Sequence, residues 1–181
     1  GPKYSFAAIG KNSYEQKDLN KLCYNLALDV SIFEQQGCNS PHTVFIEDGG
    51  PVSADLFSES LSKAMEEVLK IIPKTNIGAS EAYNVLNKRA EYSFMGKVFS
   101  SSGTEWTVIF SEEDSLADAC YSRIIFVRPI DDIYNILSLI ENKKHQTLGL
   151  QIDDNIKIDF CTRATSLGIE RICEIGKMSY F

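Results

Sequence analysis

One cysteine in a polar turn is the first residue whose position suggests chemistry. The stretch "IFEQQGCNSPHTVFIE" covers residues 32–47 and contains Cys38 between a helix-like segment and a strand-like segment. A thiolate is a nucleophile, and a loop on a rigid scaffold can hold a thiol toward a cleft. Free cysteine is also among the most buried residue types, so simple packing is the alternative interpretation of Cys38.

The chain has two histidines that could assist such a thiol. His42 lies four residues after Cys38, but Pro41 intervenes and a strand begins there, so we interpret His42 as a structural or surface residue. His145 ends a predicted helix, where an imidazole can simply interact with the helix dipole, and it is the second candidate catalytic residue. The C-terminal end of a helix is negative and does not activate a thiol, so Cys38 would need a base or an electropositive setting from elsewhere.

The remaining cysteines fit packing roles. The five cysteines are odd in number, widely spaced and without a CxxC pair. This pattern argues against a disulfide framework and against a structural zinc site, so no metal ligands are predicted. Reduced thiols in a cytoplasmic protein are the simplest interpretation. The four that lie in or beside apolar stretches are Cys23, Cys120, Cys161 and Cys173.

Strand-like and helix-like segments alternate along the chain. Apolar residues of the segment 12–37 recur every three or four positions, which predicts a helix that Gly37 ends, with a capping box at Ser13 and Gln16 or a start near Asp18. The other predicted helices are 53–72 with Ser53 as the cap, 79–91, 131–144 and about 154–164. The predicted strands are 3–10, 42–47, a hairpin at 97–110, 123–130, 146–152 and 169–175. This alternation is typical of an α/β domain with a mainly parallel sheet.

Composition excludes several classes of protein. The formal net charge of −7 argues against a nucleic-acid binder and against a basic membrane-surface protein. No apolar run approaches the length of a transmembrane helix, and the N-terminus lacks a secretory signal pattern. No GxGxxG or GxxxxGK[ST] motif is present, and Gly49-Gly50 is interpreted as a plain turn.

The stretch "ALDVSIFEQQGCNSPHTVFIED" resembles the catalytic cysteine segment of the aldehyde dehydrogenase superfamily. Its Gln-Gln-Gly-Cys-Asn-Ser-Pro version is similar to the bacterial fatty acyl-CoA reductase (LuxC-type) family. The stretches "GPKYSF", "RIIFVRPIDDIYNIL", "KKHQTLGLQI" and "GIERICEIGKM" agree with it, so the resemblance spans essentially the whole chain. It implies a three-layer α/β/α fold and a catalytic domain over residues 1–181, with the nucleotide-binding domain absent from this chain.

The resemblance also implies a reaction. The Cys38 thiolate would attack a (long-chain) fatty acyl-CoA, and NADPH, held in the parent enzyme outside this chain, would reduce the acyl-cysteine through a thiohemiacetal to the fatty aldehyde. His145 would act as an acid or base, or contact the CoA phosphate. The partners implied are fatty acyl-CoA or another acyl donor, with a homo-oligomer or acyl-transfer partner enzymes left open.

The sequence departs from the superfamily pattern at one glutamate, and two other functions stay open. The superfamily's glutamate for the cofactor ribose should fall near residues 118–121, where "DACY" has no glutamate. The general-base glutamate and the oxyanion-hole asparagine would lie outside the chain. A non-redox cysteine acyltransferase or hydrolase would need a Cys–His pair, such as Cys38 with His42 or His145. A non-catalytic interaction domain would leave Cys38 inert.

Overall fold

The protein is built on one seven-stranded sheet. The computed structural model describes residues 3–141 and 144–180. The strand order is β3-β4-β5-β2-β1-β6-β7, with β3 antiparallel to β4 and every other neighbouring pair parallel. The strands are β1 (Tyr4–Ile9), β2 (Pro41–Glu47), β3 (Lys97–Ser100), β4 (Thr107–Phe110), β5 (Ile124–Ile130), β6 (His145–Gln151) and β7 (Arg171–Cys173).

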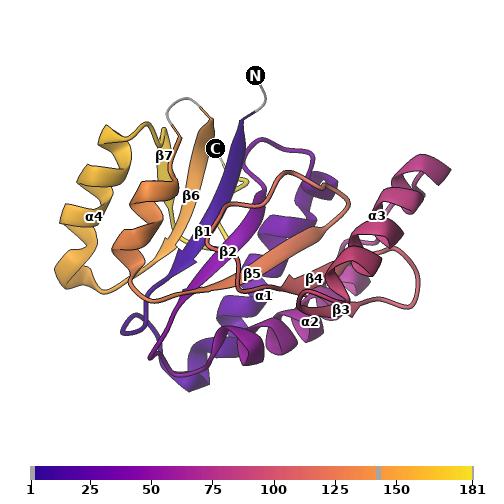
Figure 1. Ribbon diagram of the computed structural model, residues 1–181, viewed down its shortest axis with the longest axis horizontal. Helices are drawn as coiled ribbons and strands as arrows, with labels where there is room; N and C mark the ends of the chain where they lie inside the picture. The colour runs from indigo at the N-terminus through magenta and orange to yellow at the C-terminus, as the bar shows by residue number, and fades with distance from the viewer. Residues whose placement is uncertain (1–2, 142–143, 181) are drawn as a thin grey trace.

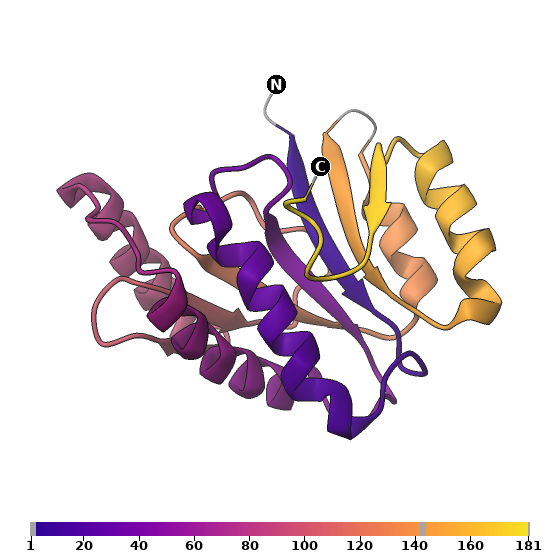
Figure 2. The ribbon, with the colours of Figure 1, turned by 180° about the vertical axis from the view of Figure 1, so that it is seen from behind.

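Helices cover both faces of this sheet (Figures 1 and 2). One face carries α1 (Leu19–Ser31) and α2 (Ala54–Ile71), and the other carries α3 (Ala79–Tyr92), the 3₁₀ helix η3 (Ile133–Leu139) and α4 (Asp154–Ser166). The alternation of side chains along β1 shows why both faces are apolar: Ala7 and Ile9 pack toward α1 and α2, whereas Phe6 and Ala8 pack toward η3 and α4. The predicted three-layer α/β/α fold with a mainly parallel sheet is confirmed.

Several local predictions are also confirmed. The hydroxyl of Ser53 caps α2 by accepting the backbone N–H of Leu56 at 3.3 Å. Gly78 directly precedes α3. The hairpin at 97–110 is formed by β3 and β4 around the predicted turn. Gly49 adopts a φ of 84° in the turn after β2, a conformation that glycine allows.

The predicted helix 12–37 is confirmed in its alternative start near Asp18 and is wrong at its C-terminal end. A capping box between Glu15 and Asp18 opens the 3₁₀ helix η1 (Gln16–Asp18), and α1 begins only at Leu19, so the alternative start near Asp18 is the correct one. The α-helix ends at Ser31, six residues before Gly37, and is followed by the 3₁₀ segment η2 (Ile32–Gln35). The left-handed residues are not Gly37 but three residues within η2: Phe33, Glu34 and Gln35, with φ of 54°, 54° and 62°.

The predicted helix 131–144 is a shorter 3₁₀ helix. Residues 142–143 lie outside the described residues, and η3 spans only Ile133–Leu139. Ile133 and Ile136 are both buried against α4, and their spacing of three matches the three-residue turn of a 3₁₀ helix. Asp132 caps this element by accepting the N–H of Tyr134 at 2.8 Å, which fits the aspartate predicted at its start.

The left-handed turn after α1 predicts an unusual sensitivity at Gln35. The buried Gln35 amide donates to the carbonyls of Pro41 (2.8 Å) and Ile124 (2.7 Å) and accepts the N–H of Ile124 (3.0 Å). Gln35→Leu removes these partners from buried backbone groups, so we expect it to lower the free energy of unfolding by about 2–4 kcal/mol. Urea denaturation of the chain followed by circular dichroism measures this loss.

The neighbouring substitution Gln36→Leu is the matched control, because the Gln36 side chain is exposed. It should change the unfolding free energy by no more than about 0.5 kcal/mol. Equal effects of the two substitutions would contradict the assigned role of the Gln35 amide.

Candidate active site

Cys38 lies at the amino edge of the parallel sheet. It occupies the turn between η2 and β2, and its side chain is exposed. The strand register brings Ser5 of β1 opposite Pro41 and Tyr4 opposite His145, so the starts of β1, β2 and β6 meet at this edge (Figure 1). Open α/β sheets usually bind ligands at the carboxyl edge, so the placement of Cys38 is a distinctive feature of this chain.

Two left-handed turns hold the Cys38 turn in place. The second turn, Tyr121–Arg123, has φ values of 56° to 57° and directly precedes β5. Arg123, whose side chain is 1% exposed, donates from Nη2 and Nε to the two carboxylate oxygens of Glu34 at 2.8 and 3.0 Å. It also donates to the carbonyl of Ile72 at 2.8 Å. This ion pair and the Gln35–Ile124 hydrogen bonds join the two turns. We call these contacts together the turn lock.

A chain of side-chain hydrogen bonds approaches the thiol from the other side. Ser5 Oγ donates to the Cys38 carbonyl at 2.6 Å and accepts the N–H of Thr147 at 3.0 Å. Thr147 Oγ1 donates to Asn39 Oδ1 at 3.0 Å. The Cys38 thiol is 4.0 Å from the same Asn39 oxygen, within the range of a weak S–H hydrogen bond. Residues from β1 and β6 therefore fix both the backbone and the side-chain surroundings of Cys38.

The other four cysteines differ from Cys38. Cys23 is fully buried on the apolar face of α1, and burial raises the pKa of its thiol to about 12. Burial also raises the pKa of each of the three half-buried thiols, Cys120, Cys161 and Cys173. Thiolate character controls cysteine reactivity, so these four are suited to packing and Cys38 is the exposed thiol of the chain.

His145 shares the amino edge with Cys38 but makes different contacts. Its Nδ1 accepts the N–H of Glu141 at 3.1 Å, and its ring packs edge-on against Phe6 at 5.6 Å between centroids. The acceptor role of Nδ1 leaves the proton of the neutral ring on Nε2. Burial lowers the pKa of His145, so the neutral form prevails at neutral pH. The described residues include no hydrogen bond between Cys38 and His145.

His42 is buried rather than a surface residue. Its ring is 3% exposed and lies edge-on between Tyr4 and Tyr121, with centroid distances of 6.2 and 5.5 Å. Its Nδ1 has no hydrogen-bond partner among the described residues. Of the two interpretations of His42, structural or surface, this placement fits the structural one. No Cys38–His42 hydrogen bond occurs in the described part of the chain.

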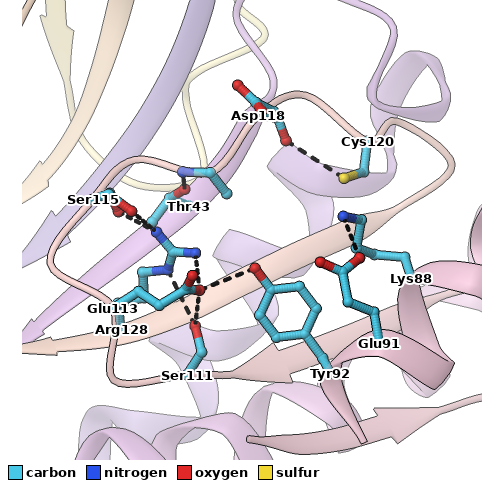
Figure 3. Close-up of polar contacts among 11 residues, drawn as sticks. Thr43, Lys88, Glu91, Tyr92, Ser111, Glu113, Ser115, Asp118, Cys120 and Arg128 are labelled. Carbon is cyan, nitrogen blue, oxygen red and sulfur yellow. Dashed lines mark hydrogen bonds and ion pairs between the residues drawn. The ribbon is translucent and has the colours of Figure 1, made fainter. Parts of the chain in front are cut away.

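The connection 111–123 crosses the sheet face that faces α3, and buried polar contacts hold it there. Arg128 of β5, whose side chain is 2% exposed, donates to Ser111 Oγ at 3.2 Å and to Ser115 Oγ at 2.8 Å, and it pairs with Glu113 (Figure 3). Thr43 of β2 accepts the N–H of Ala117 at 3.0 Å. This connection contains the segment "DACY", in which the Cys120 thiol donates to the carbonyl of Asp118. Glu113 is therefore engaged by Arg128 rather than free for a ligand.

No alternative site with metal or membrane chemistry emerges. A hollow at the carboxyl edge is lined by four carboxylates, Asp48, Glu112, Asp114 and Asp131, and lies at the opposite end of the strands from Cys38. Across residues 3–141 and 144–180, no group of three or more metal-ligating side chains is placed to hold a metal ion. Within the same residues, no helix combines the length and the apolar character needed to span a bilayer.

Solved structures define the fold class. The chain superposes with a TM-score of 0.72 on an NAD-dependent aldehyde dehydrogenase from Burkholderia multivorans, at 15% identity, over 100% of this chain and 36% of that one. Lactaldehyde dehydrogenase from Escherichia coli gives a TM-score of 0.66 at 16% identity, over 100% of this chain and 40% of that one. The fold is therefore that of an aldehyde dehydrogenase domain.

Sequence comparison then identifies the family. The family model described as Acyl-CoA reductase (LuxC) matches residues 1–181, and the chain belongs to this family. It is 26% identical to the long-chain acyl-protein thioester reductase of Aliivibrio fischeri over 183 residues and 25% identical to that of Vibrio harveyi over 185. The chain spans about a third of each relative, 36% of its length. The resemblance inferred from the cysteine segment is confirmed.

Sequence reasoning missed the residues that support Cys38. Ser5, Asn39 and Thr147 are small polar residues without a motif of their own, and they meet only because β1 pairs with both β2 and β6. Asn39 alone had a local signal, because it directly follows Cys38.

The buried His42 predicts a pH dependence of stability. Burial lowers the pKa of His42 to about 4 from its usual 6.5. The unfolded state then binds more protons than the folded state below pH 6.5, so stability is lost as the pH falls from 6.5 toward 4, by up to about 3 kcal/mol. His42→Phe should remove this loss, and urea unfolding at several pH values measures it.

The comparison between wild type and His42→Phe isolates this contribution from that of other groups. Burial raises the pKa of Asp29 to about 6, which favours folding at low pH and acts equally in both proteins. Parallel pH profiles of wild type and His42→Phe would contradict the assignment.

Proposed function

We propose that Cys38 is the acylated nucleophile of a long-chain acyl-thioester reductase, and that this chain is its catalytic domain. The observation that carries the proposal is an exposed thiol held by the turn lock and by Ser5 at the edge of an aldehyde dehydrogenase fold. Membership of the acyl-CoA reductase family supports the same chemistry.

The first step is a thioester exchange. The Cys38 thiolate attacks the carbonyl carbon of the acyl donor, a new C–S bond forms, and the donor C–S bond breaks as the donor thiol leaves with a proton. The backbone N–H of Cys38 has no hydrogen-bond partner recorded among the described residues, so it is available to the developing oxyanion. The donor is a long-chain acyl thioester on CoA or, as the relatives' names indicate for those proteins, on a protein.

The reductant is held outside this chain. We assign NADPH as the hydride donor that converts the acyl-cysteine to the aldehyde. Among the described residues, no glycine loop with a phosphate-binding motif joins a strand to a helix. Gly50, between β2 and α2, is explained by packing, because a Cβ at this position would lie only 3.2 Å from Lys11 Cα. We therefore assign the hydride step to a separate nucleotide-binding domain.

The competing functions have less support. The cysteine hydrolase or acyltransferase considered above pairs Cys38 with a histidine of this chain, whereas the partner recorded for Cys38 is the amide oxygen of Asn39. An inert interaction domain does not explain why two left-handed turns support an exposed thiol. A cytoplasmic location, a homo-oligomer and partner acyl-transfer enzymes stay predictions.

Acylation of Cys38 is the direct consequence of this proposal. When the full-length protein is incubated with palmitoyl-CoA and no NADPH, we expect about one acyl group per chain, on the peptide that contains Cys38. Cys38→Ser should abolish aldehyde formation and this thioester adduct. Cys161→Ser, at a half-buried position of α4, is the matched control and should retain both. An acyl group that persists elsewhere with full activity in Cys38→Ser would disprove the assignment.

His145 is proposed to assist the later step in its neutral form, by donating a hydrogen bond from Nε2–H to the developing alkoxide. The donor thiol leaves readily, whereas the alkoxide formed during reduction needs help with its charge. His145→Ala should therefore slow aldehyde formation by about 10²–10⁴-fold and acylation of Cys38 much less. Single-turnover kinetics with palmitoyl-CoA separates the two steps.

The second histidine supplies the control for this experiment. His42→Phe should leave both steps within about twofold, because the His42 ring packs between Tyr4 and Tyr121 and has no hydrogen bond to Cys38 among the described residues. Equal slowing of both steps by His145→Ala would instead assign His145 to donor binding, and no slowing would remove it from the site.

A further inference from the structure

The side chain of Asn39 has only one orientation that satisfies its buried neighbour. The Thr147 hydroxyl is 0% exposed, and the acceptor recorded for its proton among the described residues is Asn39 Oδ1 at 3.0 Å. If the Asn39 carboxamide turned over, its NH₂ group would face Thr147 and the buried hydroxyl proton would lose that acceptor. An unsatisfied buried donor is costly, so Thr147 fixes the carboxamide with its oxygen inward.

The same oxygen faces the sulfur of Cys38. The distance from Sγ to Asn39 Oδ1 is 4.0 Å, and Asn39 is 7% exposed. A carboxamide oxygen accepts a hydrogen bond from a neutral thiol but offers nothing to a thiolate, which needs a donor. Hydrogen bonding to the neutral form of a group disfavours the charged form.

Ser5 anchors this arrangement by joining the backbone of Thr147 to the backbone of Cys38. The backbone N–H of Thr147 is bound to Ser5 Oγ at 3.0 Å, and Ser5 Oγ is also bound to the Cys38 carbonyl at 2.6 Å. Ser5 is 2% exposed and uses its hydroxyl as donor and acceptor at once. The Cys38 backbone, the Asn39 carboxamide and Thr147 are therefore linked by hydrogen bonds that all pass through Ser5 or Thr147.

We propose that Asn39 is a positioning residue that holds the Cys38 thiol in its protonated form, and that Thr147 fixes the Asn39 carboxamide in the orientation that does so. The resting nucleophile is thereby held back until an acyl donor or the rest of the enzyme displaces this contact. The inference deepens the proposed function, because it assigns a control on the same thiol.

Two substitutions should move the reactivity of Cys38 in opposite directions. Thr147→Val keeps the shape but removes the hydroxyl, so the carboxamide can turn its NH₂ group toward the sulfur and stabilise the thiolate. We expect alkylation of Cys38 at pH 7 to become about threefold faster or more. Asn39→Asp keeps the acceptor for Thr147 and adds a negative charge beside the sulfur, so alkylation at pH 7 should become about tenfold slower or more.

The measurement is the rate of iodoacetamide alkylation of the full-length protein between pH 6 and 10, read for the Cys38 peptide by mass spectrometry. The midpoint pH of the profile should fall in Thr147→Val, rise in Asn39→Asp and return to the wild-type value in Thr147→Ser. Thr107→Val, which alters another fully buried strand threonine, is the matched control and should leave the midpoint unchanged.

Loss of packing alone would not shift the midpoint in opposite directions. An unchanged or raised midpoint in folded Thr147→Val, or an unchanged midpoint in Asn39→Asp, would overturn the proposal. If Thr147→Val does not fold, Asn39→Asp still decides the outcome, because it preserves both shape and the Thr147 hydrogen bond. Mapping the palmitoyl adduct in a separate portion of the wild-type protein tests the proposed function independently. The alkylation midpoint of free Cys38 does not depend on whether Cys38 is the residue that the acyl donor modifies.

Discussion

The position of Cys38 depends on the turn lock between the two left-handed turns at 33–35 and 121–123. Left-handed backbone costs an ordinary residue about 1–2 kcal/mol, and six non-glycine residues adopt it here. The bidentate Glu34–Arg123 pair, which is partly buried, and the fully buried Gln35 amide offset that cost with hydrogen bonds. Because these contacts join η2 to the start of β5, they place the turn between η2 and β2, with its exposed thiol, at the amino edge of the sheet.

The turn lock also organises the face opposite α1 and α2. Its second turn ends the connection 111–123, which Arg128 and Thr43 hold across β5 and β2 (Figure 3). Tyr121 from this turn packs against His42, and Tyr4 covers the other edge of the His42 ring. The buried imidazole, the crossing connection and the cysteine turn therefore form one structural unit.

The sequence was informative where local rules decide the structure. The Ser53 cap, the Gly78 start and the strand patterns follow from local chemistry, and Cys38 was recognisable because it lies off the helical face. The end of α1 was not predictable, because Gln35 is satisfied by Ile124, 89 residues away, and no local pattern reports that partner. The link from Thr147 to Asn39 likewise exists only after β1 and β6 pair. His145 was recognisable as a candidate but lies in contacts separate from those of the thiol.

The central claim is that the reaction passes through an acyl group on Cys38, and its kinetic competence is the most direct test. Full-length protein loaded with a radiolabelled palmitoyl group and freed of excess donor is mixed rapidly with NADPH. The account predicts that labelled aldehyde appears at the rate at which the label leaves Cys38, and at least as fast as steady-state turnover. A label that stays on Cys38, or leaves more slowly than the enzyme turns over, would contradict it.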